Sequence, residues 1–332
     1  MASPHNPAAT IRDVAAAVGV SPMAVSKVLH GRGENVRVGA ETAERIRAAA
    51  RELKYQPNHL ARSLRSRRTQ TIGLVFEHFD RVGDENAYFL HLLNGVMSAT
   101  FPADYTLAIC PKLLKVSEQG AIADGRFDGV LWCKPNFTTH TVEGLRDSAV
   151  PVVMMHAPPN SVPGVPTYCA DNGDALQQGV EHLAKLGHRR IGFIVDQINS
   201  LTMEGRERGL AFLSASAELG LEAEILVREI ADAPPEGFTG VITFSDYNAG
   251  QLLAACDARG VRVPEDLSII GFDSTPFCER TRPKLTAISQ PVQQMARDAT
   301  VHLLALINGA SPPSPPPYKC GFDVRESTGP PP

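Results

Sequence analysis

The sequence lacks any run of 18 consecutive apolar residues, so no segment is long enough to cross a membrane as a helix. Residues 1–6 lack the charged and apolar regions of a secretory signal peptide. The cysteines stand singly, without a CxxC pair, which argues against a zinc site or a disulfide framework. They are Cys110, Cys133, Cys169, Cys256, Cys278 and Cys320. These absences predict a cytoplasmic protein with no membrane partner.

Reactive constellations are also scarce. The ten histidines are dispersed without metal-ligand spacing, and neither a nucleophile elbow nor a phosphate-binding glycine loop is present. His188, in the run LGHRR, fits a structural turn better than a catalytic base. We therefore expect no catalytic residue, no metal ion and no cofactor, and find nothing that supports an enzyme.

Positive charge is concentrated at one end of the chain. The whole chain carries −4, yet residues 1–70 hold 12 Lys and Arg against 5 Asp and Glu, a balance of +7. The rest holds 20 against 31, a balance of −11. A basic head on an acidic body predicts that the head binds a polyanion such as nucleic acid. From charge alone, the alternative to polyanion binding is a basic face that contacts only solvent.

A short helix with clear start and stop signals is predicted near the amino end. Thr10 can cap its first turn, and Asp13 three residues later completes a capping-box pair. Gly19 then supplies a tight turn. The apolar face of this helix comprises Ile11, Val14, Ala15 and Val18.

A second helix begins after Ser21, which can cap it, and a third covers about residues 40–54 with Ile46 pointing to a common core. The second helix packs through Val25, Val28 and Leu29 and leaves Pro22, Met23, Ser26 and Lys27 on its other face. Two short helices joined by a glycine-containing turn form a helix-turn-helix unit. Its outward residues can enter the DNA major groove; a three-helix bundle without a ligand is disfavoured by the positive charge.

The head contains three segments in a characteristic order: TIRDVAAAVGVSPMAVSKVLHG, VGAETAERIRAAARELKYQPN and HLARSL. Further along come LAKLGHRRIGFI, VPEDLSIIGFD, PKLTAISQP and VRESTG. Together these segments resemble the lac repressor (LacI/GalR) family of bacterial transcription regulators. The resemblance implies a repressor that binds a pseudo-palindromic, double-stranded DNA operator as a homodimer.

By this resemblance the helix starting at Pro22 is the recognition helix. Pro22, Met23 and Lys27 would face base edges. Lys27 can donate to guanine O6 or N7, whereas Met23 offers only apolar contact, for example to a thymine methyl. The residues implied to lie nearer the phosphates are Thr10, Ser21, Ser26 and His30.

The resemblance also implies a hinge helix that becomes ordered on the operator. Leu64 would wedge into the minor groove and kink the duplex. Arg62 and Arg65 would neutralise phosphates, so that affinity falls steeply with salt. Asn58 can cap this helix, and Ala61 belongs to the same DNA-contacting set. The alternative interpretation of this segment is a basic linker between two domains.

After residue 69, strand-like runs such as TIGLVFEHF and RRIGFIVD alternate with helical patterns. The alternation predicts an α/β fold with doubly wound parallel sheets. The resemblance implies two such lobes facing across a cleft, as in periplasmic sugar-binding proteins. We therefore divide the chain into a helix-turn-helix head (1–56), a hinge helix or linker (57–69) and a two-lobed effector-binding and dimerisation domain (70–328).

Ligands of doubly wound sheets bind at the carboxyl ends of strands. Asp246 ends VITFSD and Asp273 ends SIIGFD, so both carboxylates are expected at the cleft, although Asp246 fits a helix cap equally well. Arg206, three residues before Gly209, matches the family's ligand-contacting arginine. An arginine opposite a carboxylate can bind vicinal hydroxyls, which predicts a small-molecule effector such as a sugar.

Three body segments depart from the family pattern. ADAPPEGFT (231–239) stands where the family usually has a full helix. The segment 101–128 is shorter than in the family pattern, and the run FDRVGDENAYFL differs from that pattern. A missing helix would leave the sheet exposed unless a partner or a loop covers it. Two alternatives stay open: a constitutive regulator without an effector, and a sugar-binding module without DNA activity. The basic head and the lack of a signal peptide disfavour the second.

Overall fold

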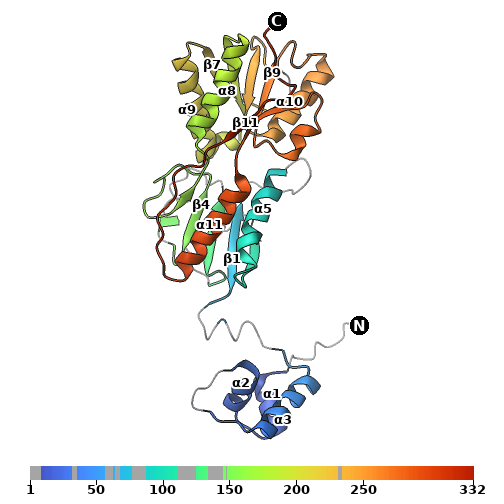
Figure 1. Cartoon of the computed structure of the whole chain (residues 1–332), viewed down its shortest axis with the longest axis vertical. Coiled ribbons are helices and arrows are strands. Elements are labelled where there is room, and N and C mark those ends of the chain that lie inside the picture. Colours follow the sequence, from blue (N-terminus) through green and yellow to red (C-terminus); the bar gives the residue numbers. More distant parts are fainter. Residues whose placement is uncertain are drawn as a thin grey trace. The chain divides into compact units, whose positions relative to one another are not determined.

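The computed structural model describes residues 9–31, 36–56, 63, 68–76, 87–110, 125–133, 145–146, 148–230 and 234–332. The chain divides into two compact units, which we name the head (1–69) and the body (70–332) (Figure 1). Among the helices of the described residues, none is long and apolar enough to cross a membrane.

The head folds as the capping signals predicted. Its helices are α1 (Ile11–Val18), α2 (Pro22–His30) and α3 (Ala40–Glu52). The Thr10 hydroxyl accepts a hydrogen bond from the Asp13 backbone N–H at 3.4 Å, and the Asp13 carboxylate accepts one from the Thr10 backbone N–H at 2.7 Å. Gly19 ends α1 in the left-handed region, and Ser21 caps α2 by accepting a hydrogen bond from the Ala24 backbone at 3.2 Å.

A small apolar core holds the three helices together. Its buried members are Val14, Ala15, Val18, Val25, Ile46 and Ala50. α2 packs against both α1 and α3. The Arg45 guanidinium of α3 also donates to the Val18 carbonyl at 3.1 Å, which ties α3 to the end of α1. With so few buried side chains, the stability of the head depends strongly on each of them.

The first sheet of the body is wholly parallel, as the alternating pattern predicted. Its strands run in the order β2-β1-β3-β4-β5. They are β1 (Thr71–Phe76), β2 (Thr106–Cys110), β3 (Gly129–Cys133), β4 (Val152–Met155) and β5 (Thr167–Tyr168). With α5 (Ala87–Thr100) and α11 (Val292–Ile307), this sheet forms the N-terminal lobe (Figure 1).

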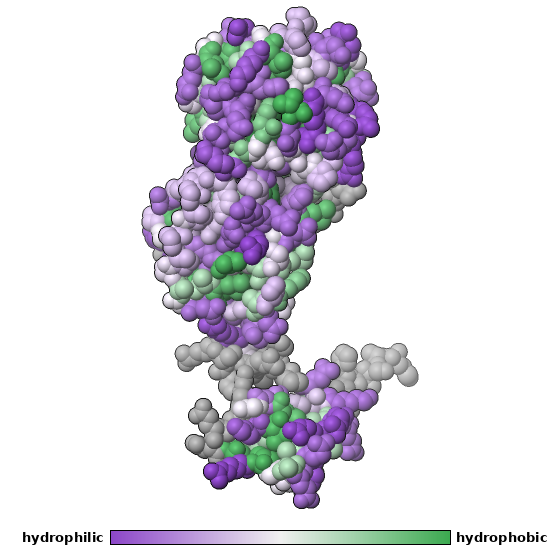
Figure 2. Space-filling view, viewed as in Figure 1, coloured by the Kyte–Doolittle hydropathy of each residue, from purple (hydrophilic) through white to green (hydrophobic). Residues whose placement is uncertain are grey.

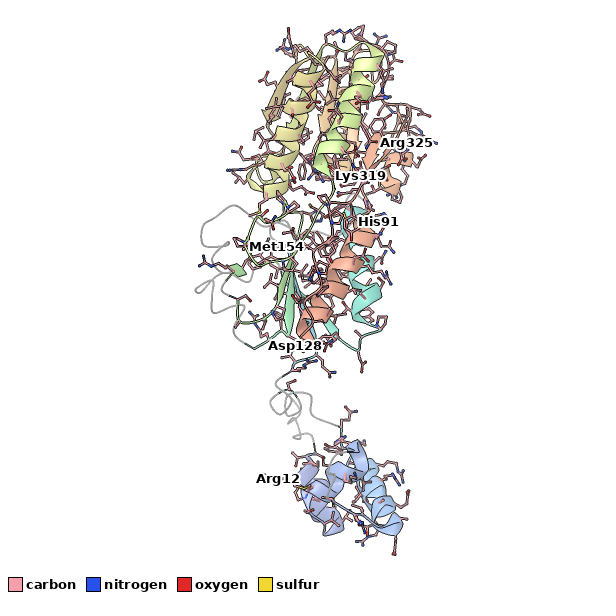
Figure 3. The ribbon with its side chains drawn as sticks, turned by 60° about the vertical axis from the view of Figure 1, so that its left-hand side comes forward. Arg12, His91, Asp128, Met154, Lys319 and Arg325 are labelled. Carbon is pink, nitrogen blue, oxygen red and sulfur yellow. The ribbon has the colours of Figure 1, made fainter. Side chains whose placement is uncertain are left out.

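α5 and α11 come from distant parts of the sequence and lie side by side. A Cβ added at Gly95 would lie 2.3 Å from the Gln293 carbonyl oxygen and 2.7 Å from the Ala296 Cβ, so the close approach of the helices requires glycine. At the lower end of this lobe in Figure 3, Asp128 accepts a hydrogen bond from the Gln70 backbone at 2.9 Å. The N-terminal lobe is thus built from two separate parts of the chain, because α11 follows most of the C-terminal lobe in sequence.

The second sheet forms the C-terminal lobe. Its strands run in the order β11-β10-β9-β8-β6-β7, and only β10 and β11 pair antiparallel. They are β6 (Arg190–Val195), β7 (Glu222–Val227), β8 (Gly240–Thr243), β9 (Ser268–Phe272), β10 (Thr286–Ser289) and β11 (Gly321–Asp323). The helices of this lobe are α8 (Asn172–Leu186), α9 (Met203–Glu218) and α10 (Asp246–Arg259).

The crossover from β7 to β8 contains no helix in its described residues, 228–230 and 234–239. The sheet is nevertheless covered, because Ile230 and Phe238 are buried against it at 3% and 9% exposure. The Arg190 guanidinium stacks over the Phe238 ring, 4.8 Å from its centre. The sequence analysis allowed either a partner or a loop to cover this part of the sheet, and the structure shows a loop.

Side chains of the C-terminal lobe and of the C-terminal segment hold the two together, as Lys319 and His188 illustrate. Lys319, labelled in Figure 3, donates to the Asp171 carboxylate at the start of α8 at 2.9 Å. His188 is a buried structural residue, as expected: its ring nitrogens lie 2.8 Å from the Thr239 hydroxyl and 2.9 Å from the Gly329 carbonyl oxygen. Burial lowers the pKa of His188, although the Gly329 hydrogen bond opposes the shift, so the neutral ring is favoured. The face of the C-terminal lobe that is visible in Figure 2 is mostly hydrophilic.

Candidate functional site

One edge of α2 is left uncovered by the head. Ser21 and Pro22 are exposed and Met23 is 61% exposed, whereas Val25 is fully buried. Lys27 is partly exposed and lies one helical turn after Met23, on the same face. This edge therefore presents a hydroxyl, an apolar chain and a cation in sequence, which are groups that contact phosphates, thymine methyls and guanine acceptors.

One predicted DNA-contacting residue of α2, Ser26, is placed differently from the prediction. The prediction that Ser26 lies on the exposed face is wrong, because it is only 8% exposed. α2 packs against two helices, so its buried arc extends beyond Val25 to the next position. The His30 ring is partly buried, with Nε2 3.4 Å from the Tyr55 hydroxyl. Thr10 is exposed at the start of α1, as predicted.

The predicted hinge helix falls largely outside the described residues. Five of its DNA-contacting residues belong to that undescribed part, and their assignment stays a prediction. They are Asn58, Ala61, Arg62, Leu64 and Arg65. Of residues 57–67, only Ser63 is described, and it is helical.

A second candidate site lies in the body, around a buried arginine of α9. Arg208 is 1% exposed. Its guanidinium donates to the Asn172 side-chain oxygen (3.1 Å), the Phe244 carbonyl (2.7 Å) and the Glu204 carboxylate (2.7 Å). The ring of Phe272 lies beneath it, 3.5 Å from ring centre to guanidinium carbon. Glu204 lies on α9 itself, Asn172 begins α8, and Phe244 and Phe272 lie at the carboxyl ends of β8 and β9, where doubly wound sheets bind ligands.

Glu204 connects this arginine to the other lobe. It is 2% exposed, and the oxygen that accepts from Arg208 lies 3.0 Å from His156 Nδ1, just after β4. The other ring nitrogen of His156 contacts the hydroxyl of Tyr88 on α5. A chain of buried polar contacts therefore runs from Tyr88 and His156 in the N-terminal lobe to Glu204 and Arg208 in the C-terminal lobe. We name these four residues the interlobe network.

Local sequence explains the position of Glu204. The Thr202 hydroxyl caps α9 by accepting from the Gly205 backbone N–H at 3.0 Å, so Glu204 lies in the first turn. A Cβ at Gly205 would lie 2.0 Å from the Asn199 carbonyl oxygen, so only glycine lets the preceding 3-10 turn pack this closely. Arg208 follows Glu204 by four residues, the spacing that places oppositely charged side chains together on a helix.

The structure also places Arg206 and Asp246, whose assignment as effector-binding residues stays a prediction. Arg206 is exposed, because two residues along a helix rotate the side chain by about 200°, away from the face that buries Arg208. Asp246 is not the cap of α10, since Ser245 holds that position. Its carboxylate instead accepts from the Thr275 backbone N–H at 2.7 Å and holds the segment after β9. Burial raises the pKa of Asp246 to about 6.

Asp273 lies where the sequence predicted, directly after β9. It is 9% exposed and accepts a hydrogen bond from the side-chain amide of Gln290. Its backbone φ of +112° is unusual for a residue with a side chain, and such strain concentrates at functional sites. Burial raises the pKa of Tyr88 well above its usual value, and the charges of Glu204 and Asp273 add to the shift. In the chain, Asp273 directly follows Phe272, whose ring lies against the Arg208 guanidinium.

Within the described residues, no group of three His, Cys, Asp or Glu side chains is arranged to hold a metal ion. All six cysteines are free, and five of them are buried.

Both the head and the body match known protein families. Residues 10–58 match the bacterial regulatory proteins of the lacI family, and residues 69–239 match the periplasmic binding proteins and sugar binding domain of the LacI family. Residues 180–328 match a periplasmic binding protein-like domain. The chain belongs to the LacI family. It is therefore a DNA-binding transcription regulator with a body like a periplasmic binding protein, as the quoted segments indicated.

Named relatives span nearly the whole chain. The transcriptional repressor PurR of Haemophilus influenzae (strain PittEE) is 30% identical over 318 residues, covering 90% of this chain and 91% of the relative. PurR of Pectobacterium carotovorum (strain PC1) is 31% identical over 321 residues, covering 89% of each chain. These relatives are transcription regulators; none of these comparisons identifies a ligand for this LacI-family chain.

Solved structures agree on the fold. The lac repressor dimer bound to operator and the anti-inducer ONPF aligns with a TM-score of 0.79 at 20% identity, covering 97% of this chain and 99% of that one. The regulator CelR in complex with cellobiose aligns with a TM-score of 0.67 at 26% identity, covering 96% and 99%. The shortened crossover of this LacI-family chain therefore leaves the family fold intact.

Proposed function

We propose that this regulator binds a pseudo-palindromic operator as a homodimer, represses transcription, and responds to a small neutral molecule such as a sugar held between the lobes of its body. One observation carries the DNA assignment: the three-helix core leaves the Ser21–Met23 edge and Lys27 of α2 uncovered in a unit with a balance of +7. Two such heads related by a twofold axis would read two half-sites. A regulator must reach the chromosome, so we infer the bacterial cytoplasm as its location.

The support for an effector site is the position of Arg208. It lies at the carboxyl ends of β8 and β9 and is connected through Glu204 to His156 of the opposite lobe. A ligand that binds there contacts both lobes and can therefore shift their relative positions. Regulation further requires that the ligand bind two states of the dimer with different affinities.

A second candidate function is a constitutive regulator without an effector. It is favoured by one observation: the Arg208 guanidinium already donates to Glu204, Asn172 and the Phe244 carbonyl. An incoming ligand must compete with these internal partners, or bind beside them.

The test of both candidates is selection of bound duplexes from a random pool, followed by a screen of neutral sugars for release of the selected duplex. We expect enrichment of a two-half-site sequence and at least one sugar that weakens binding tenfold or more, about 1.4 kcal/mol. Enrichment without any releasing sugar favours the constitutive regulator. A pool with no enrichment at moderate ionic strength contradicts the operator proposal.

A further inference from the structure

The body begins with a residue in an unusual backbone conformation. Gln70, directly before β1, has a φ of +51°, in the left-handed region that favours glycine. A residue with a side chain keeps such a conformation only where its surroundings hold it. Because Gln70 is the first residue of the body, its backbone angles set the direction in which the linker leaves the body.

Hydrogen bonds from both neighbouring strands hold Gln70 in place. Its carbonyl oxygen accepts from the backbone N–H of Thr106, the first residue of β2, at 2.8 Å. Its backbone N–H donates to the side-chain carboxylate of Asp128, directly before β3, at 2.9 Å. The Asp128 backbone N–H also donates to the Thr71 carbonyl at 2.9 Å, so Asp128 contacts both Gln70 and the first residue of β1. We name the Gln70–Asp128 contact the linker clamp.

Asp128 is itself fixed by close packing on both sides. The preceding residue, Phe127, is 6% exposed, and a Cβ added at Gly73 of β1 would lie 3.1 Å from its ring. The following residue, Gly129, lies so close to α11 that an added Cβ would approach Ile307 Cδ1 to 2.9 Å. Figure 3 shows Asp128 at the lower end of the N-terminal lobe. With both neighbours packed this closely, the Asp128 carboxylate approaches Gln70 from a rigid support.

Without the Asp128 carboxylate, the Gln70 N–H loses an acceptor and the left-handed conformation loses a contact that holds it. From this geometry we propose that Asp128 is a positioning residue for DNA binding. It fixes the direction in which the linker leaves each body, and with it the separation of half-sites that the two heads of a dimer bind together. A fixed direction raises the effective concentration of the second head at one separation and lowers it at others. The proposal rests on the two-half-site operator of the proposed function.

The experiment uses the full-length protein and duplexes that carry two half-sites of the selected operator, separated by different numbers of base pairs. Each added base pair turns one half-site by about 35° relative to the other, so the series samples direction as well as distance. A duplex with a single half-site measures the affinity of the head alone. Gel-shift titration gives the affinity for every duplex, and calorimetric melting gives the stability of the body.

Two variants of the linker clamp are compared with two controls. Asp128→Ala removes the acceptor, whereas Asp128→Asn keeps a side-chain oxygen that can accept from Gln70. Asp104→Asn is the charge control, because Asp104 is an exposed carboxylate of the same lobe. Val153→Ala is the stability control. Val153 is fully buried on β4, two strands from β1, so its truncation destabilises the body without touching the linker clamp.

We expect the wild type to lose about tenfold in affinity when the best separation changes by one base pair, and Asp128→Ala to lose no more than about threefold. Asp128→Asn and both controls should keep the wild-type dependence on separation, Val153→Ala despite its lower melting temperature. The affinity for the single half-site should be the same for all variants, because the head is unchanged. A folded Asp128→Ala protein with the wild-type dependence would overturn the positioning role, and so would a Val153→Ala protein that loses this dependence.

Hydrogen exchange tests the linker clamp in the wild type without any substitution. We expect the Gln70 amide to exchange at least about tenfold more slowly than in an unstructured peptide of the same sequence. Exchange at the unstructured rate would overturn the proposal even if Asp128→Ala failed to fold. A wild type without any preferred separation contradicts the two-half-site operator itself, whereas a preferred separation that survives in Asp128→Ala contradicts only the positioning role.

Discussion

Replacing Ile46 with alanine is expected to abolish DNA binding while leaving the melting of the body unchanged. Among the described residues of the head, Ile46 is fully buried in an apolar core of six buried side chains. Truncating a buried isoleucine to alanine costs about 2–5 kcal/mol. Domains of this size have a total stability of only a few kcal/mol, at about 0.05–0.15 kcal/mol per residue. The substitution therefore unfolds the head and with it the exposed edge of α2.

The control for this prediction is the neighbouring residue. Arg47 is exposed, and its contact with Glu44 at 3.2 Å is a surface ion pair, so Arg47→Ala should change head stability by no more than about 0.5 kcal/mol. Gel-shift titration measures DNA binding, and calorimetric melting follows head and body separately. An Ile46→Ala protein that binds duplex as tightly as the wild type would show that the head core does not support the DNA contact.

The second large effect is expected for Arg208→Ala, which should lower the stability of the body by about 3–5 kcal/mol. Arg208 is 1% exposed, and its removal leaves the buried Glu204 carboxylate without its counter-charge. Asn172 and the Phe244 carbonyl lose a donor as well. For a unit of this size, each kcal/mol shifts the melting temperature by about 2–4 °C, so a fall on the order of 10 °C is expected.

Arg206→Ala is the matched control for this second prediction. The side chain lies two residues away on the same helix and is exposed, so solvent screens any contact that it makes and its loss should change body stability by no more than about 1 kcal/mol. Scanning calorimetry of both variants under the same conditions measures the difference. Equal losses for the two arginines would mean that the buried contacts of Arg208 do not stabilise the body.

Much of the fold followed from local signals. The caps at Thr10 and Ser21, the left-handed glycine after α1 and the alternating strand pattern each predicted an element that the structure contains. Such signals act within a few residues, so no tertiary information is needed to detect them. The structure of the crossover after β7 was harder to predict from the sequence. The residues that cover the sheet there, Ile230 and Phe238, are identified only by their packing.

The interlobe site was predicted only in part. Asp273 was found from its place after an apolar strand, whereas the sequence analysis singled out Arg206 and not Arg208, the arginine that the structure buries. Helical periodicity could have distinguished them, since Arg208 lies on the face that also buries Phe212 and Ala215. Glu204 shares that face, and its spacing of four from Arg208 was a usable signal for an ion pair. Tyr88, His156 and Gln290 carry no local signal, because they meet the site only through tertiary folding.

The most direct test of the central claim, that the uncovered edge of α2 recognises DNA sequence, is the affinity of Lys27→Ala for a selected operator and for random duplex. Lys27 is partly exposed on the same face as Met23. The loss of its contact to a guanine edge should weaken operator binding by about 1–3 kcal/mol and leave random-duplex binding almost unchanged. Equal losses on both duplexes would contradict the account, because they would make Lys27 a phosphate contact without a part in recognition.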